Sequence, residues 1–271
     1  MRDTSTYDTL NNLAVWQAMP TITLEQMRRV RLMNRVDTKY VLSYRELLTL
    51  LDRAQAEGYC VQQIDGKRAV GYNTLYYDTP ERRMYLVHHN QELTRQKIRT
   101  RTYVESGQTF LEIKNKSNRG RTRKERTSID RALFYGFTGD KAAMDFFAPR
   151  SAYRSDELSP ALATRFVRIT LVNAALTERI TIDLDLRYED VRTGCSATIE
   201  GMVILELKQD GLTASAMKRL LRAMRIAPLK VSKYCLGTAL TVEGIKKNRF
   251  KLKLRDIEKR LHSIKIITTN S

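Results

Sequence analysis

The chain has 271 residues, 42% of them hydrophobic. This is enough for one large domain or two small ones, with a hydrophobic core that needs no disulfide or structural metal to be stable. Its 48 lysines and arginines against 30 acidic residues give a net charge of +18, which predicts a polyanionic partner such as nucleic acid, an anionic membrane or a phosphate-rich ligand. Three distant cysteines without a C-x-x-C pair argue against a zinc site or a disulfide framework. Without a signal pattern or an apolar run of roughly 20 residues, we expect a soluble, cytoplasmic protein.

The N-terminal segment, residues 1–34, carries one clear helix signal. Thr23 and Gln26 form a capping pattern that opens a short basic helix over residues 23–33.

A strand and a helix follow this segment. Residues 35–42 alternate polar and apolar side chains, as a half-buried strand does. Ser43 and Glu46 then form a capping box ahead of an apolar helix face, and Gly58 is placed to end that helix.

The middle of the chain is mainly of strand character. The predicted strands cover residues 70–77, 92–104, 109–116, 122–129, 162–172, 179–188 and 202–208. Short helices are expected at residues 80–87 and 141–147. Many strands with few β-α-β spacings predict an α+β protein built on an antiparallel β-barrel with flanking helices.

Two helices and a basic tail end the chain. Residues 213–224 and 232–242 read as helices separated by Pro228. The tail holds a basic, loosely amphipathic helix, which we interpret as a docking helix; a membrane-surface or partner-binding segment is the alternative. We expect one domain, residues 35–242, with the segments 1–34 and 243–271 appended.

The strand around residue 98 carries its charge on one face. Alternation places Arg95, Lys97, Arg99 and Arg101 on the same side, which is typical either of a solvated edge strand or of the wall of an anion site. A charged face recurs on other strands, with the residues Arg35, Asp37, Lys39, Glu112, Lys114, Lys116, Lys124, Arg126, Arg168, Arg179, Asp183, Arg187, Glu206 and Lys208. In a closed barrel covered by helices this pattern makes a polar tunnel, with Arg95 at its mouth.

Carboxylates among these cations predict a metal site, because carboxylates hold a divalent ion between phosphate oxygens. Glu206 is the best ligand candidate and Glu112 a weaker one; a salt bridge to an arginine is the alternative for both. Ser232 lies at a predicted helix N-cap between Lys230 and Lys233, where a phosphate would find free backbone N–H groups, although ordinary capping explains it equally well. The sequence has no P-loop and no Rossmann fingerprint. Three histidines show no ligand spacing and are expected at the surface: His88, His89 and His262.

Seven motifs, in order, resemble the VTC domain, the catalytic domain of the vacuolar transporter chaperone polyphosphate polymerases, in the triphosphate tunnel metalloenzyme (CYTH-like) superfamily. They are Arg35-Val36-Asp37-Thr38-Lys39-Tyr40, Tyr76-Tyr77-Asp78-Thr79-Pro80, Lys97-Ile98-Arg99-Thr100-Arg101-Thr102-Tyr103, Phe110-Leu111-Glu112-Ile113-Lys114, Arg179-Ile180-Thr181-Ile182-Asp183, Leu205-Glu206-Leu207-Lys208 and Ser232-Lys233-Tyr234-Cys235-Leu236-Gly237. The match covers residues 35–240. Two departures are Arg35 in place of the superfamily's first carboxylate and Phe166 in place of a tyrosine.

The resemblance implies a β-barrel tunnel that binds ATP with Mn²⁺ or Mg²⁺ and passes the γ-phosphate to a growing polyphosphate chain. The residues that it implies as phosphate ligands are Lys39, Arg99, Arg101, Lys114, Arg168, Lys230, Ser232 and Lys233, with Lys124 or Arg126 added to the wall. Lys97 shares the charged face of its strand with Arg99 and Arg101, so we expect it in the same wall. Glu206, with Glu112 as the weaker candidate, would bind the metal.

Two other functions fit the same residues: a tunnel triphosphatase that hydrolyses inorganic triphosphate or a nucleoside triphosphate, and a non-catalytic polyanion-binding module. Nucleic acid is disfavoured as the partner, because no aromatic-rich stacking strand is present and Glu112 and Glu206 would repel its backbone. The membrane-spanning segment of the eukaryotic polymerases is missing, so coupling to transport would need a separate membrane protein, with the basic tail as its contact.

Overall fold

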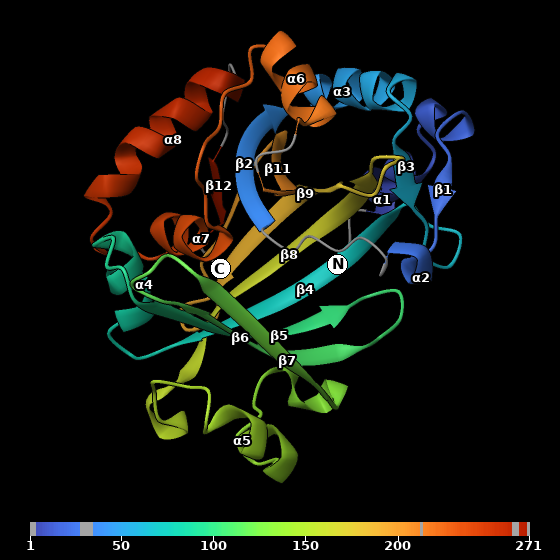
Figure 1. Cartoon of the computed structure of the whole chain (residues 1–271). Helices are drawn as coiled ribbons and strands as arrows, with labels where there is room; N and C mark the ends of the chain where they lie inside the picture. The colour runs from blue at the N-terminus through green and yellow to red at the C-terminus, as the bar shows by residue number, and fades with distance from the viewer. Residues whose placement is uncertain (1–3, 28–34, 212–213, 262–265, 270–271) are drawn as a thin grey trace.

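A computed structural model describes residues 4–27, 35–211, 214–261 and 266–269 (Figure 1). Its strands belong to one sheet: β1 (Thr21–Ile22), β2 (Arg35–Ser43), β3 (Cys60–Gln62), β4 (Ala69–Asp78), β5 (Arg95–Tyr103), β6 (Thr109–Lys116), β7 (Thr122–Ile129), β8 (Ser159–Val172), β9 (Glu178–Asp190), β10 (Ser196–Ile199), β11 (Met202–Asp210) and β12 (Ile266–Thr269). The α-helices are α1 (Thr4–Asn11), α2 (Leu24–Met27), α3 (Tyr44–Ala56), α4 (Arg83–His89), α5 (Lys141–Phe147), α6 (Ala216–Ala223), α7 (Lys233–Thr241) and α8 (Asn248–Leu261). In the described ranges, no helix has the length and hydropathy needed to span a bilayer.

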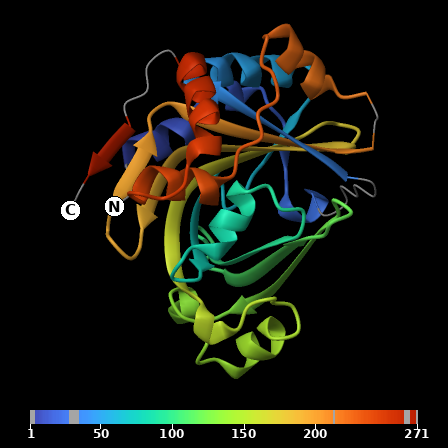
Figure 2. The ribbon, with the colours of Figure 1, turned by 90° about the vertical axis from the view of Figure 1, so that its left-hand side faces the viewer.

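The sheet curls into a half-barrel (Figures 1 and 2). Its main path is antiparallel, in the order β2-β11-β9-β8-β4-β5-β6-β7. The predicted antiparallel barrel fold with flanking helices is confirmed, but among the described residues the two end strands, β2 and β7, are not paired with each other. Part of the outer edge of β2 is instead occupied by the chain before α7, where the Leu229 N–H donates to the Lys39 carbonyl at 2.8 Å.

A β-bulge divides β9 into two pairing regions. One extra residue lies in β9 where Arg165 pairs with Arg187 but Val167 pairs with Leu184, and Asp185 at this point has a positive φ of 47°. Before the bulge β9 pairs with β11, and after it with β10. Because a bulge bends its strand and increases the local twist, it helps the sheet to curl.

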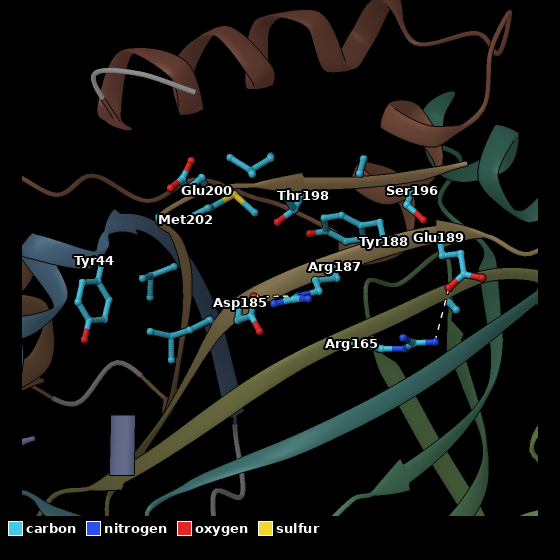
Figure 3. Close-up of a pocket in the computed structure, with 16 residues that line it drawn as sticks. Tyr44, Arg165, Asp185, Arg187, Tyr188, Glu189, Ser196, Thr198, Glu200 and Met202 are labelled. Carbon is cyan, nitrogen blue, oxygen red and sulfur yellow. Dashed lines mark hydrogen bonds and ion pairs between the residues drawn. The ribbon is translucent and has the colours of Figure 1, made fainter. Parts of the chain in front are cut away.

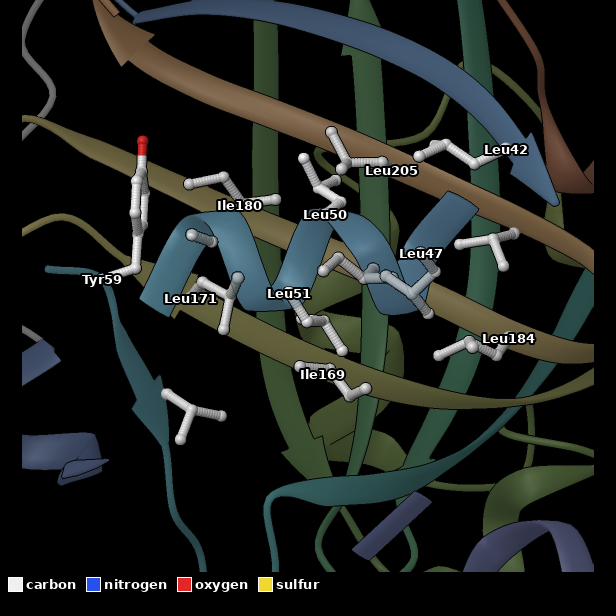
Figure 4. Packing of buried hydrophobic residues seen from close by; sticks show 14 of the residues in the cluster. Leu42, Leu47, Leu50, Leu51, Tyr59, Ile169, Leu171, Ile180, Leu184 and Leu205 are labelled. Atoms are coloured by element: carbon white, nitrogen blue, oxygen red, sulfur yellow. The ribbon is translucent and has the colours of Figure 1, made fainter. Parts of the chain in front are cut away.

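Helix α3 covers the outer face of the curled sheet. The capping box predicted for Ser43 and Glu46 is present, with the Glu46 N–H donating to Ser43 Oγ at 3.2 Å. Leu47, Leu50 and Leu51 are fully buried in one cluster with side chains from β8, β9 and β11 (Figure 4). Burial of each leucine contributes roughly 1.5–3 kcal/mol, so this layer anchors the strands that carry the inner side chains.

Several predicted elements differ at their ends. The helix predicted over residues 23–33 begins as expected, with the Gln26 N–H donating to Thr23 Oγ1, but its second half lies outside the described residues. The strand predicted from residue 92 begins at Arg95, and the basic tail forms α8 followed by β12. Short strands β1, β3, β10 and β12 and helix α1 were not predicted, because two to eight residues carry too little periodicity.

The predicted surface position of His89 is wrong. Its side chain is 1% exposed because α8 covers it: the His89 ring lies 5.5 Å from that of Phe250, and its Nε2 accepts from the Arg249 N–H at 3.4 Å. Helix α8 is therefore docked on α4 and β2, as the docking interpretation of the tail predicted, and His262 lies outside the described residues.

Gly237 marks a close approach between α7 and the sheet. A Cβ added there would lie 2.6 Å from Tyr188 Cδ1 and 2.7 Å from Leu162 Cδ2. We expect Gly237→Ala to lower the free energy of unfolding by about 1–3 kcal/mol, because α7 would have to move away from β8 and β9. Thermal unfolding followed by circular dichroism measures this loss. Gly139→Ala, where a Cβ meets nothing within 4 Å, is the matched control, and equal melting temperatures for the two variants would contradict the prediction.

Candidate anion-binding site

Most of the charged side chains predicted to share a face do so, but the prediction for Arg187 is wrong. The bulge in β9 places Arg187 beside Arg165, on the opposite face from Asp183. On β5, Lys97 and Arg99 pair in register with Lys114 and Glu112 of β6. On the other side of the curl, Lys39 of β2 pairs with Glu206 of β11. Desolvation within the curl of the sheet lowers the pKa of Lys114, Glu206 raises it, and Lys97, Lys39 and Arg99 lower it further. Lys114 of β6 therefore interacts electrostatically with Lys39 of β2 and Glu206 of β11, because the curl of the sheet brings β6 towards these two strands. We call this concave surface the inner face.

Three carboxylates on the inner face are each held by two cations. Glu112 is 1% exposed; its Oε2 accepts from Arg99 Nε at 2.7 Å and its Oε1 accepts from Lys124 Nζ at 2.5 Å. Burial alone would raise the pKa of Glu112, but Arg99, Arg101 and Lys124 hold it well below its usual range. This carboxylate is therefore an ionised counterion inside the sheet.

Asp183 and Glu206 repeat the arrangement on β9 and β11. Arg168 binds Asp183 in a bidentate pair, with Nε at 2.5 Å from Oδ1 and Nη2 at 2.8 Å from Oδ2, and Lys233 of α7 contacts the same Oδ2. Glu206 accepts from Lys39 with Oε1 and from Lys208 with Oε2. Although burial raises the pKa values of both carboxyls, these cations lower them well below the usual range, so both stay ionised.

Three further cations on the inner face have no carboxylate partner in the part of the chain that the structure describes. The Arg101 guanidinium donates to Thr74 Oγ1 at 3.0 Å, Lys97 Nζ donates to Ser232 Oγ at 2.7 Å, and Lys114 is exposed without an ion pair. Burial lowers the pKa of Arg101, and Arg99 and Arg168 lower it further, so its charge opposes folding. Such cations are what a bound polyanion would neutralise.

The N-terminal end of α7 is fixed over this surface. Ser232 caps the helix by accepting from the Cys235 N–H at 3.3 Å, as predicted. In the first turn of α7, the Tyr234 hydroxyl donates to Asp78, a fully buried carboxylate that also accepts from the Met84 and Tyr85 N–H groups at 2.8 and 3.0 Å. Asp78 thus joins β4, α4 and α7, and the Tyr-Tyr-Asp-Thr-Pro motif holds the helix that presents Lys233.

The predicted phosphate ligands are not equally placed. The structure brings together Lys39, Lys97, Arg99, Arg101, Lys114, Lys124, Arg168, Ser232 and Lys233 on the inner face. On β7, Lys124 donates to Glu112 of the inner face at 2.5 Å, whereas Arg126 donates to the Tyr103 hydroxyl at 2.9 Å, so Lys124 is the better candidate. Lys230 is exposed, two residues before the cap. Their roles as ligands stay predictions.

Sequence reasoning left three residues out of the candidate site. Asp183 and Lys208 had the correct parity on their strands, which was the available signal, but their partners depend on strand order. Tyr76 accepts from Arg99 Nη1 at 3.2 Å. Burial raises its pKa, but Arg99, Arg101, Lys97 and Lys233 outweigh this effect and lower it. Its hydroxyl is therefore a polar group in a strongly positive field.

A divalent metal fits this donor set through one carboxylate. The described residues contain no group of three His, Cys, Asp or Glu side chains placed to hold an ion. Mg²⁺ and Mn²⁺ take oxygen ligands and are often held by one or two carboxylates together with substrate phosphates. The Glu206 side chain is 20% exposed, whereas Glu112 is closed off, so Glu206 is the carboxylate that fits this role better.

A pocket of about 590 Å³ lies elsewhere (Figure 3). It is lined by Arg165, Asp185, Arg187 and Glu189, among others. Because side chains alternate along a strand, Arg165 lies on the other face of β8 from Arg168. The pocket therefore belongs to the outer face and is separate from the inner cations.

Ligand binding on the inner face should be linked to protons near neutral pH. Enclosure away from water and the nearby Arg99 and Arg101 lower the pKa of Lys124 to about 7, although Glu112 raises it. A bound phosphate raises this pKa again, so Lys124 carries more positive charge in the complex than in the free protein. We therefore expect triphosphate binding at pH 8 to take up protons and to weaken as pH rises.

Calorimetry in two buffers of different ionisation enthalpy measures this uptake. Lys124→Met should reduce it, whereas Lys141→Met, at an exposed ion pair with Asp145, should not. Equal uptake by the wild type and Lys124→Met would show that another group takes the proton.

The fold and the inner face together define a class of protein: a curled antiparallel sheet that holds an excess of cations around a few ionised carboxylates, suited to binding a polyanion. The sequence of residues 34–242 matches the model of the VTC domain, and the chain belongs to this family. The predicted resemblance is thereby confirmed. A comparison with curated proteins returned no match.

Some solved structures are similar to the chain at low identity. A candidate adenylate cyclase from Vibrio parahaemolyticus is 15% identical, with a TM-score of 0.44, covering 76% of this chain and 99% of that chain. A candidate adenylyl cyclase from Hippeastrum, described as having a dominant triphosphatase activity, is 14% identical, with a TM-score of 0.48, covering 78% and 98%. A candidate adenylate cyclase from Bacillus halodurans is 11% identical, with a TM-score of 0.44, covering 74% and 96%. The family assignment rests on the sequence match alone.

Proposed function

We propose that the chain is a metal-dependent polyphosphate polymerase that transfers the γ-phosphate of ATP to a growing polyphosphate chain on the inner face. The observation that carries the proposal is a set of three cations, Lys97, Arg101 and Lys114, that have no carboxylate partner among the described residues and lie on a sheet of the VTC domain family. Their charge matches a triphosphate, which hydrogen-bonds to ionised donors more strongly than a neutral ligand does.

The transfer needs no protein nucleophile. A terminal oxygen of the acceptor chain attacks the γ-phosphorus of ATP, the bond from that phosphorus to the bridging oxygen breaks, and ADP leaves. Arg101 and Lys114 hold phosphate oxygens in position, which reduces the entropic cost of bringing donor and acceptor together. Lys97 and the amino groups of Lys39 and Lys233 oppose the negative charge on the transferring group.

Glu206 would hold the metal, with the remaining ligands supplied by phosphate oxygens and water. When bound, Mn²⁺ or Mg²⁺ neutralises phosphate charge and polarises the reacting phosphoryl group. Lys39 and Lys208 keep Glu206 ionised and oriented from both sides, so the carboxylate is ready to accept the ion.

Product analysis tests the proposal. Purified protein is incubated with ATP and Mn²⁺ or Mg²⁺, with a metal-free sample containing chelator as control. A polymerase yields ADP and long polyphosphate on a gel, with little free phosphate. If free phosphate forms in the same amount as ADP, the protein is a triphosphatase and the polymerase proposal is wrong. If ATP binds but no ADP forms, the protein is a non-catalytic binding module.

A further inference from the structure

A second cluster of cations lies where the inner face ends. Arg95, the first residue of β5, pairs in register with Lys116, the last residue of β6. Arg95 lies two residues from Lys97 on the same face, about 7 Å along the strand. Lys230 lies two residues before Ser232, whose hydroxyl accepts from Lys97. The three cations therefore surround the end of the site described above.

Helix α8 adds a fourth cation from outside the residues matched by the family. Its first turn is fixed to the end of α4, because Arg249 donates from its N–H to His89 Nε2 at 3.4 Å and from Nη1 to the Asn90 carbonyl at 3.3 Å. Lys253 lies four residues after Arg249, one helical turn further along the same side of α8. Burial lowers the pKa of Lys253, and Lys230 and Arg95 lower it further, although Cys235 raises it. Arg95, Lys116, Lys230 and Lys253 are named the end cluster here.

The end cluster differs from the centre of the inner face in its lack of acidic partners. No ion pair joins any of its four members to a carboxylate within the described ranges. The pKa of Lys116 is lowered mainly by Arg95, and burial and Lys230 lower it further. The neighbouring His88 shows the same field: burial, Lys97 and Arg95 lower its pKa to about 2. The positive charge at this end is uncompensated.

We propose that the end cluster is an additional anion site that binds the phosphates of a linear polyphosphate beyond those held at the centre of the inner face. This inference rests on the proposed function and names its preferred ligand, a phosphate chain longer than a triphosphate. Lys253 makes helix α8 one wall of the site, although α8 lies outside residues 34–242. Linear polyphosphate suits the end cluster because its negative charges are spaced along a chain, and the cations of the protein also follow one line, from Lys97 to Arg95 at the end of β5.

Binding assays with two probes test the site without relying on turnover. The wild type, Lys116→Gln/Lys253→Gln and the control Lys251→Gln/Lys259→Gln are titrated with inorganic triphosphate and with long-chain polyphosphate. The control removes the same charge from exposed positions of α8, so it accounts for the general field of the protein. Circular dichroism checks that each variant is folded.

We expect the end-cluster variant to bind long polyphosphate about tenfold more weakly, with a shallower dependence on salt, because two cation–phosphate contacts are lost. Its affinity for triphosphate should change less than about twofold, as should both affinities of the control. Equal weakening by the two double variants, or equal weakening for both probes, would overturn the proposal. The proposal would also be overturned if single-stranded DNA bound as tightly as long polyphosphate and if its binding were weakened equally by the loss of Lys116 and Lys253.

The outcomes separate this inference from the proposed function. If triphosphate binds but chain length has no effect on affinity, the end cluster is not a site and the polymerase proposal stands. If long polyphosphate binds through Lys116 and Lys253 while ATP is neither bound nor consumed, the end cluster stands and the polymerase proposal falls.

Discussion

Arg101→Met is expected to weaken triphosphate binding by about 10- to 100-fold while leaving the fold as stable as before or more stable. Arg101 is 6% exposed, and in the described part of the chain its guanidinium has no carboxylate partner. Methionine loses the cation–π contacts of the guanidinium with Tyr72 and Phe166, but it also removes a buried charge that Arg99 and Arg168 repel. Calorimetric titration with triphosphate and thermal unfolding measure the two effects.

Arg99→Met is the matched comparison, two residues away on the same strand. It should also lose ligand affinity, but it leaves the buried Glu112 carboxylate with Lys124 as its remaining ionic partner. An incompletely paired buried charge is costly, so we expect the free energy of unfolding to fall by about 2–3 kcal/mol. If both variants lose stability equally, Arg101 is a structural residue and its assignment to the ligand is wrong.

Glu206→Gln is expected to reduce metal-dependent turnover by about a hundredfold or more, because an amide is a poor ligand for a hard divalent ion. The change also reaches Lys208. Burial lowers the pKa of Lys208 to about 8 even though Glu206 raises it, so without Glu206 this lysine loses part of its charge at neutral pH. ADP release measured over a range of Mn²⁺ and Mg²⁺ concentrations shows the loss.

Glu125→Gln provides the control for this experiment. Glu125 of β7 also lies between two arginines, Arg150 at 3.0 Å and Arg123 at 3.1 Å, but on the opposite face of its strand from Lys124. It should lose some stability and keep its turnover and metal dependence. Full activity in Glu206→Gln would exclude Glu206 as the metal ligand.

Local signals in the sequence predicted the elements that carry the site. The capping box at Ser43 depends on residues three apart, and the one-sided charge of β5 depends on strand alternation, so both can be read without tertiary information. The seven ordered motifs then indicated the family, which the match over residues 34–242 confirms.

The sequence suggested a salt bridge to an arginine for Glu112, which Arg99 provides, but the partners in the ion pairs could not be predicted. That Arg168 pairs with Asp183, and Glu206 with both Lys39 and Lys208, follows from strand order and register. These pairings decide which cations are free for a ligand, and hence why Arg99 and Arg101 should differ. The sequence also could not show that β2 and β7 are not paired with each other in the described residues, because side chains alternate in the same way in open and closed sheets.

Because β2 and β7 are not paired with each other in the described residues, the curl of the sheet can change more easily than the shape of a closed barrel. In a closed barrel, moving these walls apart would break a ladder of hydrogen bonds, each contributing about 0.5–1.5 kcal/mol. Here the described parts of β2 and β7 share no such bonds, so a change in curl costs mainly strand twist. Lys114 is repelled by Lys39 and attracted by Glu206 across the opening, and we expect a bound polyanion to draw the two walls together. The distance between the two walls is therefore expected to depend on the net charge that lies between them.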